Sequence, residues 1–148
     1  MYTSIVVGTD GSATARAAVG EAHRLAKECS AQVHVVTAYK MTGTLAAAGT
    51  WATGAATAHG AWDESAQLAV AQQLEEAAGP MRHDGLKVET YAIPGDAAAA
   101  IVQVAESTDA DLVIVGSKGM QGARRVLGSV PNSVAHNAPC SVLVFKTC

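Results

Sequence analysis

Two glycine-containing segments in the carboxy-terminal part of the chain carry groups suited to binding a phosphate. The first is Gly116-Ser117-Lys118-Gly119, and the second, Gly128-Ser129-Val130, follows after a spacer of eight residues. Glycine lets the backbone approach an anion closely, so that successive amides and hydroxyls can donate hydrogen bonds to its oxygens. An ordinary turn is the alternative, but a turn does not require glycine at both ends and a second Gly-Ser pair. We therefore interpret the two segments as a phosphate-binding element.

The surroundings of these segments favour a negatively charged ligand. The chain has a net charge of −3, yet no acidic residue follows Asp111, whereas four basic residues do. Ser129 is a predicted N-cap, and the helix that it starts would direct the positive end of its dipole at a bound phosphate. Lys118 or Arg124 would add charge-assisted hydrogen bonds, and Arg125 is interpreted as a surface residue.

A second candidate loop, Gly8-Thr9-Asp10-Gly11-Ser12, follows the first apolar segment of the chain. It offers a carboxylate, two hydroxyls and two glycines just before a predicted helix. The alternative is a tight turn in which Asp10 or Ser12 caps that helix. In open α/β sheets, ligands bind beyond the carboxyl ends of the strands. If the strands at 4–7 and 112–115 are neighbours, both loops border one cleft.

Other chemistries find no support in the residue patterns. The chain contains neither GxxxxGK[ST] nor a GxGxxG after its first strand, and its five histidines show no metal-ligand spacing. We interpret the histidines as surface or packing residues and expect no metal site. No GxSxG or Cys/His arrangement suggests a nucleophile, and no pair of carboxylates suggests acid-base catalysis. We expect a binding protein, not an enzyme.

Length and composition indicate one intracellular domain. The 148 residues form a single domain of ordinary size, 1–148, and the three cysteines form no CxxC pair. No apolar run approaches the roughly 20 residues of a membrane span, and no secretory signal precedes the first strand. These features predict a cytoplasmic protein that binds neither membrane nor nucleic acid.

Strand-like and helix-like segments alternate along the whole chain. Apolar patterns predict strands at 4–7, 32–38, 87–93, 112–115 and 141–145, and helices at 13–29, 63–78, 97–107 and from Ser129 onward. This alternation predicts an α/β fold, a parallel sheet with helices on both faces. The segment 41–60 is rich in Ala, Gly and Thr, and we expect a mobile loop there, either a bland insertion or a lid over a ligand.

The chain resembles the universal stress protein family over essentially its whole length. The resemblance rests on the opening Ile5-Val6-Val7-Gly8-Thr9-Asp10-Gly11-Ser12, the strand from Asp111 to Gly116, the two glycine segments, and the ending Ala138 to Phe145. ATP-binding members carry the pattern G-x2-G-x9-G-[ST]. Here the second spacer, Met120 to Leu127, has eight residues and not nine.

The resemblance implies an open five-stranded parallel sheet in the order 3-2-1-4-5 that binds an adenine nucleotide. Asp10 would contact the adenosine, and the backbone at Ala38 would meet the base. Ribose and phosphates would be held by the glycine segments, at Gly116, Gly119, Gly128, Ser129 and Val130.

The ligand that the resemblance implies is ATP, with Mg²⁺ possible, and AMP or cyclic AMP are the alternatives. Family members also dimerise through their last strand, here Val142 to Phe145. Two further readings remain open at this point. One is a nucleotide-independent interaction module of the same fold, and the other is a slow ATPase that uses Asp10 and Ser12.

Overall fold

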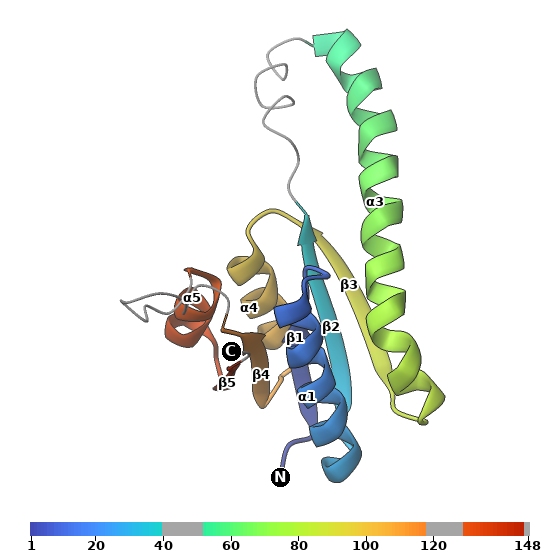
Figure 1. Ribbon diagram of the computed structural model, residues 1–148. Helices are drawn as coiled ribbons and strands as arrows, with labels where there is room; N and C mark the ends of the chain where they lie inside the picture. Colours follow the sequence, from blue (N-terminus) through green and yellow to red (C-terminus); the bar gives the residue numbers. More distant parts are fainter. Residues whose placement is uncertain (40–51, 118–128, 147–148) are drawn as a thin grey trace.

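The protein is described by a computed structural model that covers residues 1–39, 52–117 and 129–146, with the backbone alone over 52–64 (Figure 1). Its centre is a sheet of five parallel strands, in the order β3-β2-β1-β4-β5. The strands are β1 (Ser4–Gly8), β2 (Gln32–Tyr39), β3 (Val88–Pro94), β4 (Leu112–Gly116) and β5 (Ser141–Phe145). The α/β class and the implied strand order are both confirmed.

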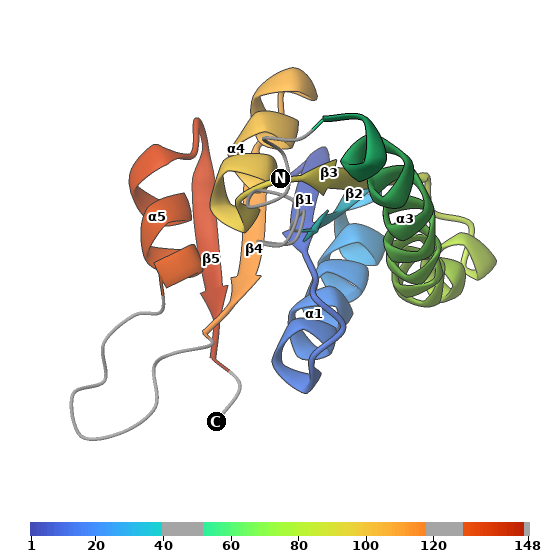
Figure 2. The same cartoon turned by 90° about the horizontal axis from the view of Figure 1, so that it is seen from above.

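In the described residues, four helices cover the sheet in two layers (Figure 2). Helices α1 (Ala13–Cys29) and α3 (Ala52–His83) lie on one face, and α4 (Ala97–Ser107) and α5 (Ser129–Asn137) lie on the other. Side chains alternate between the two faces along each strand. In β1, Ile5 and Val7 join the core beneath α1 and α3, whereas Val6 joins the core beneath α4, and all three are fully buried.

Helix α1 fits closely on the sheet because small side chains line its buried face. Ala18, Ala22 and Ala26 recur at helical spacing and are fully buried. Ser12 caps the start, accepting a hydrogen bond from the Ala15 amide at 3.2 Å, and Ser30 ends the helix in the left-handed conformation at φ 56°. The cap at Ser12 fixes where the loop after β1 must stop.

Helix α3 differs from the sequence prediction at both ends. It begins at Ala52 and not at Asp63, so the loop expected over 41–60 is helical from residue 52 onward, and residues 40–51 lie outside the described part of the chain. The stretch before Asp63 is rich in alanine, the best helix former, and this outweighs its scattered glycines and threonines.

At its other end α3 continues to His83, past the predicted end at Ala78 and through Gly79 and Pro80. A proline inside a helix removes one backbone hydrogen bond. Here Ala78 and Met81, on either side of the Gly-Pro pair, are fully buried. Their burial against the sheet holds the chain helical where local propensity predicts an end. No helix in the described residues is both long enough and apolar enough to cross a membrane.

Asp111 joins the start of β4 to the start of the chain. Its Oδ2 accepts hydrogen bonds from the Thr3 amide at 2.8 Å and the Thr3 hydroxyl at 2.9 Å, and its Oδ1 accepts one from the Ser4 amide at 3.1 Å. Burial raises the pKa of the Asp111 carboxyl, but these hydrogen bonds more than offset it, so the pKa lies below its ordinary value. The ionised carboxylate therefore stabilises the pairing of β1 with β4.

We expect Asp111→Ala to lower the free energy of unfolding by about 1–2 kcal/mol at pH 7, since charge-assisted hydrogen bonds are lost at a partly exposed site. A depressed pKa contributes stability above the unfolded-state value and loses it as the pH falls through the folded-state value. Urea denaturation of both proteins between pH 7 and pH 3 should show the difference shrinking in acid. A difference that stays constant over this range would contradict the role of the ionised form.

Candidate functional site

The strand order reverses direction between β1 and β4, and this reversal opens a crevice at their carboxyl ends. Strands β1 and β4 are neighbours, with Val7 paired to Ile114. The chain leaves β1 for α1 on one face of the sheet and leaves β4 toward α5 on the other. At such a switch point the two outgoing loops separate and leave room for a ligand. The condition for both loops to border one cleft, that these two strands are neighbours, is thereby met.

A cavity of about 410 Å³ occupies this crevice. Seven of the residues predicted for a ligand site line it, namely Thr9, Asp10, Ser12, Ala38, Gly116, Ser129 and Val130. Gly11 and Ser117 adjoin the lining residues without lining the cavity. Lys118, Gly119 and Gly128 lie outside the described residues. The loop after β1 and the described parts of the two glycine segments therefore line the same cavity.

The loop after β1 is fixed by hydrogen bonds through almost every residue. The Thr9 amide donates to the Val36 carbonyl at 2.9 Å, and the buried Thr37 hydroxyl donates to the Thr9 carbonyl at 2.9 Å. Within the loop, the Gly11 amide donates to the Thr9 hydroxyl oxygen at 3.2 Å, and the Ser12 amide to Asp10 Oδ1 at 2.9 Å. These contacts hold the Asp10 carboxylate at the wall of the cavity before any ligand is bound.

The capping alternative for this loop is correct for Ser12 and compatible with a ligand site. The Ser12 hydroxyl caps α1, as an ordinary turn before a helix would require, and Ser12 still lines the cavity. Gly11 has φ +79°, a backbone conformation that residues other than glycine rarely adopt. The glycine there serves the turn.

Gly116 lies in the cavity wall, but packing within the protein already requires glycine at this position. A Cβ at this position would lie 2.8 Å from the Thr14 Cγ2 atom and 3.1 Å from the Thr14 carbonyl oxygen. Helix α1 therefore starts so close to β4 that only glycine fits. Gly8 is similar, since a Cβ there would lie 2.6 Å from Ile101 Cδ1. Close packing of helices α1 and α4 explains both glycines before any ligand is considered.

Ser117 takes a different position from the one that its place in the glycine segment suggests. It is 1% exposed, and its amide donates to the Phe145 carbonyl at 3.0 Å. The residue thus continues the pairing of β4 with β5 and sits behind the cavity wall. Whether Ser117 contacts a ligand stays a prediction.

The amino-terminal turns of three helices meet at the cavity. Thr14 and Ala15 belong to α1, Ala97 to α4, and Ser129, Val130 and Pro131 to α5, and all of these residues line the space. The unpaired amides at a helix start carry partial positive charge. Asp10 is the one acidic side chain among the described lining residues. The cavity therefore combines one carboxylate with three helix starts suited to anionic groups.

Several lining residues are absent from the sequence prediction. They are Thr14, Ala15, Val36, Ala97, Ile101, Val115 and Pro131, whereas Gly8, which also lines the cavity, belongs to the candidate loop after the first strand. Ala97 follows Asp96, the N-cap of α4, whose side chain accepts a hydrogen bond from the Ala99 amide at 2.9 Å. That cap was the available signal that a helix start borders the site. The apolar lining residues could not have been predicted, because their sequence pattern is the same as that of core residues.

The histidines agree with their interpretation as packing or surface residues where the structure describes them. His34 is 4% exposed, and its Nδ1 lies 2.9 Å from the Tyr91 hydroxyl, which donates to Glu89 at 2.7 Å. Burial lowers the pKa of His34 against the opposing effect of Glu89, and burial with the Glu89 hydrogen bond raises the pKa of Tyr91 to about 12. In the described parts of the chain, no cluster of three His, Cys, Asp or Glu side chains could hold a metal ion.

Comparison with known proteins extends over nearly the whole chain. The model of the universal stress protein family matches residues 1–146. A universal stress protein of Methanocaldococcus jannaschii is 32% identical over 151 residues, which cover 99% of this chain and 83% of that protein.

Solved structures show the same relationship. A universal stress protein in complex with cAMP is 30% identical, with a TM-score of 0.74 and coverage of 99% of this chain and 98% of the other. Universal stress protein UspA from Lactobacillus plantarum is 25% identical, with a TM-score of 0.69 and coverage of 97% of each chain. Because the family model and these relatives match almost every residue, this chain belongs to the universal stress protein family.

Proposed function

We propose that this protein binds an adenine nucleotide in the cavity between β1 and β4 and acts in stress adaptation or signalling in the cytoplasm. The observation that carries the proposal is a cavity of about 410 Å³ that is lined by the loop after β1 and by Gly116, Ser129 and Val130 of the glycine segments. Its volume lies within the roughly 300–1,000 Å³ of small-molecule sites. The proposed ligand is ATP.

The lining suits the three parts of a nucleotide. Val36, Ala38 and Ile101 offer apolar surface for a base. Asp10 offers a carboxylate that accepts hydrogen bonds from ribose hydroxyls. The three helix starts offer amides to phosphate oxygens, as helix N-termini do in many phosphate sites. Mg²⁺ would arrive with ATP and be held chiefly by its phosphates, with Asp10 as the available protein carboxylate.

Cyclic AMP is the second candidate ligand. The relative crystallised with cAMP is 30% identical to this chain over nearly its full length. The spacer between the glycine segments also has eight residues, one fewer than in the ATP-binding pattern. A titration with both nucleotides separates the candidates, because preference for cAMP over ATP would assign the protein to the second.

We expect Ala97→Phe to weaken nucleotide binding at least tenfold, since a benzyl group at this helix start would enter the cavity. Ala99→Phe is the matched control, because Ala99 is exposed on the same helix and does not line the cavity. Isothermal titration of wild type and both variants with ATP, ADP, AMP and cAMP measures the effect. Saturable binding that Ala97→Phe leaves unchanged would place the nucleotide elsewhere.

We propose further that the bound nucleotide is not consumed. Asp10 and Ser12 are the polar groups expected beside it, and both already accept hydrogen bonds from amides of the loop and of α1. Wild type incubated with ATP and Mg²⁺ should release ADP no faster than Asp10→Ala, as measured by chromatography. Faster turnover by wild type would instead support the slow-ATPase reading.

We also propose a homodimer that pairs β5 with β5 of a second copy. Within the described residues, β5 pairs with β4 alone, and its other edge is open. An open apolar edge strand is an aggregation hazard unless it is covered. Val142 and Val144 pack against the core beneath α4, while Leu143 and Phe145 pack against the other core, so the side chains already have partners within the monomer. The exposed backbone groups are what a second copy would pair.

Val144→Pro should convert the dimer to a monomer. The Phe145 carbonyl faces β4, where it accepts from Ser117, and backbone direction alternates along a strand, so the Val144 amide faces the open edge. Proline there removes an outward donor and leaves the bonds to β4 in place. Sedimentation velocity gives the oligomeric state, and circular dichroism checks folding. A folded variant that stays dimeric would exclude pairing through this edge.

A further inference from the structure

Three consecutive backbone carbonyls of the loop after β1 each accept a hydrogen bond from a side chain of a different element. Thr37 of β2 donates to Thr9 at 2.9 Å, and Gln73 Nε2 of α3 donates to Asp10 at 3.3 Å. Arg16 of α1 donates to Gly11 through Nε at 3.2 Å and Nη2 at 3.1 Å. The loop is therefore held from three sides, and α3 contributes to it through Gln73.

Gln73 also fills the space over Gly11. A Cβ at Gly11 would lie 2.7 Å from Gln73 Nε2 and 3.1 Å from Gln73 Cδ. The carboxamide thus lies directly against the turn that carries Asp10. Gln73 is partly buried, whereas its neighbour Gln72 is exposed. Two residues of the same type on one helix therefore differ in whether they touch the loop.

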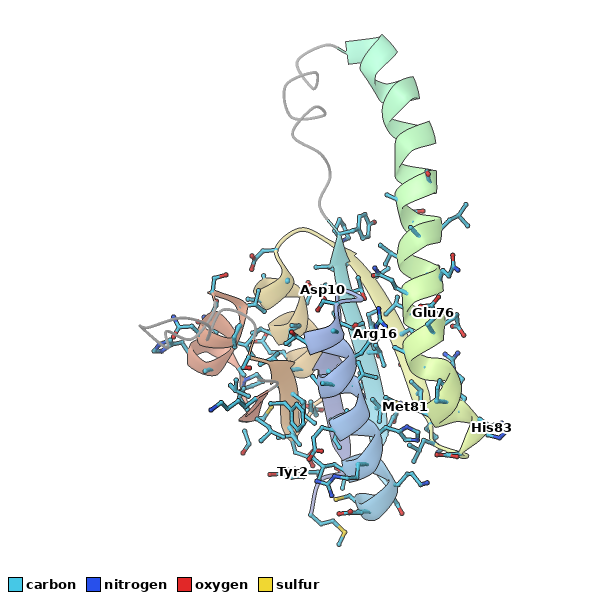
Figure 3. All side chains as sticks on the ribbon, in the orientation of Figure 1. Tyr2, Asp10, Arg16, Glu76, Met81 and His83 are labelled. Carbon is cyan, nitrogen blue, oxygen red and sulfur yellow. The ribbon has the colours of Figure 1, made fainter. Side chains whose placement is uncertain are left out.

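Helix α3 is long and extends well beyond the carboxyl end of the sheet (Figure 1). Figure 3 shows Arg16 on the side of α1 toward α3, Asp10 just before the start of α1, and Glu76 in the lower part of α3. Buried side chains at Val70 and Leu74 anchor α3 in the core beneath α1. Gln73 lies between these two anchors, so its position is fixed by core packing and follows α3 as a unit.

We propose that Gln73 is a positioning residue for the nucleotide site, which couples the loop carrying Asp10 to helix α3. The inference rests on the proposed nucleotide function and deepens it. Through this contact, the orientation of the Asp10 carboxylate depends on the position of α3. Coupling of this kind is reciprocal, so a ligand that orders the loop also favours one position of α3. A partner that binds α3 would accordingly change nucleotide affinity.

The contact requires a hydrogen-bond donor at position 73, because the Asp10 carbonyl oxygen is the acceptor. Gln73→Met keeps the length of the side chain and removes the donor. Gln73→Glu keeps the shape but sets a carboxylate against the Asp10 carbonyl oxygen, which adds repulsion. The two variants thus separate loss of the hydrogen bond from addition of charge. Gln72→Met and Gln72→Glu are matched controls, since they make the same changes on the exposed neighbour.

The test has two readouts, one of which needs no ligand. Hydrogen exchange of a peptide spanning residues 8–16 in the ligand-free protein measures how firmly the loop is held. Titration with the adenine nucleotide that wild type binds best measures the site, and thermal melting checks global stability. We expect Gln73→Met to speed exchange and weaken affinity about three- to tenfold, the size of one neutral hydrogen bond. Gln73→Glu should weaken affinity further, with the Gln72 variants near wild type.

Each outcome decides the proposal. Faster exchange together with weaker affinity, at unchanged melting temperature, supports positioning through Gln73. Wild-type exchange or wild-type affinity in both Gln73 variants overturns it, as does an equal loss in the Gln72 variants. If wild type binds no adenine nucleotide, the proposed function fails by itself. In that case unchanged exchange in the Gln73 variants would still refute the contact. Faster exchange would show that Gln73 stabilises the loop, and the proposed role in nucleotide binding would be withdrawn.

Discussion

The pairing of β1 with β4 is the constraint on which the remaining arrangement depends. These two strands are neighbours although most of the chain lies between them, and their helices leave toward opposite faces of the sheet. The crevice exists because of that divergence. Hydrogen bonds from Thr3 and Ser4 to Asp111 secure the pairing at the opposite end. The loops at the cavity are therefore positioned by contacts across the full length of the two strands.

Close packing at the carboxyl ends then limits which residues the strands can end with. A side chain at Gly116 would clash with the side chain and backbone of Thr14 in α1, and one at Gly8 would displace the Ile101 side chain of α4. Helix starts can approach the strand ends only under this condition, and their approach brings amides to the cavity wall. The same two glycines thus serve packing directly and the site indirectly. Ligand binding alone therefore does not explain why glycine stands at these two positions, because helix packing also requires it.

Local patterns were sufficient to predict the strands, three of the helices and the loop after β1, because apolar periodicity and cap residues act over a few positions. The predicted carboxy-terminal end of α3 was wrong, since burial of Ala78 and Met81 overrides the local preference at Pro80. Gln73 was missed because it lies 63 positions from Asp10 and nothing near it in sequence marks the contact. Ser117 appeared to be a loop residue, yet its amide pairs with Phe145. Strand order and ligand class came from the family resemblance.

The cavity walls come from both layers of the molecule, with α1 on one side of the sheet and α4 and α5 on the other. A ligand in the cavity would therefore contact helices from both layers, which the sheet otherwise separates. Because an unfolded chain has no such cavity, occupancy adds to folding stability by mass action, about 2.7 kcal/mol at a ligand concentration one hundred times the dissociation constant. The abundance of this protein would then follow the concentration of its ligand through turnover of the unfolded form, without any change in its synthesis.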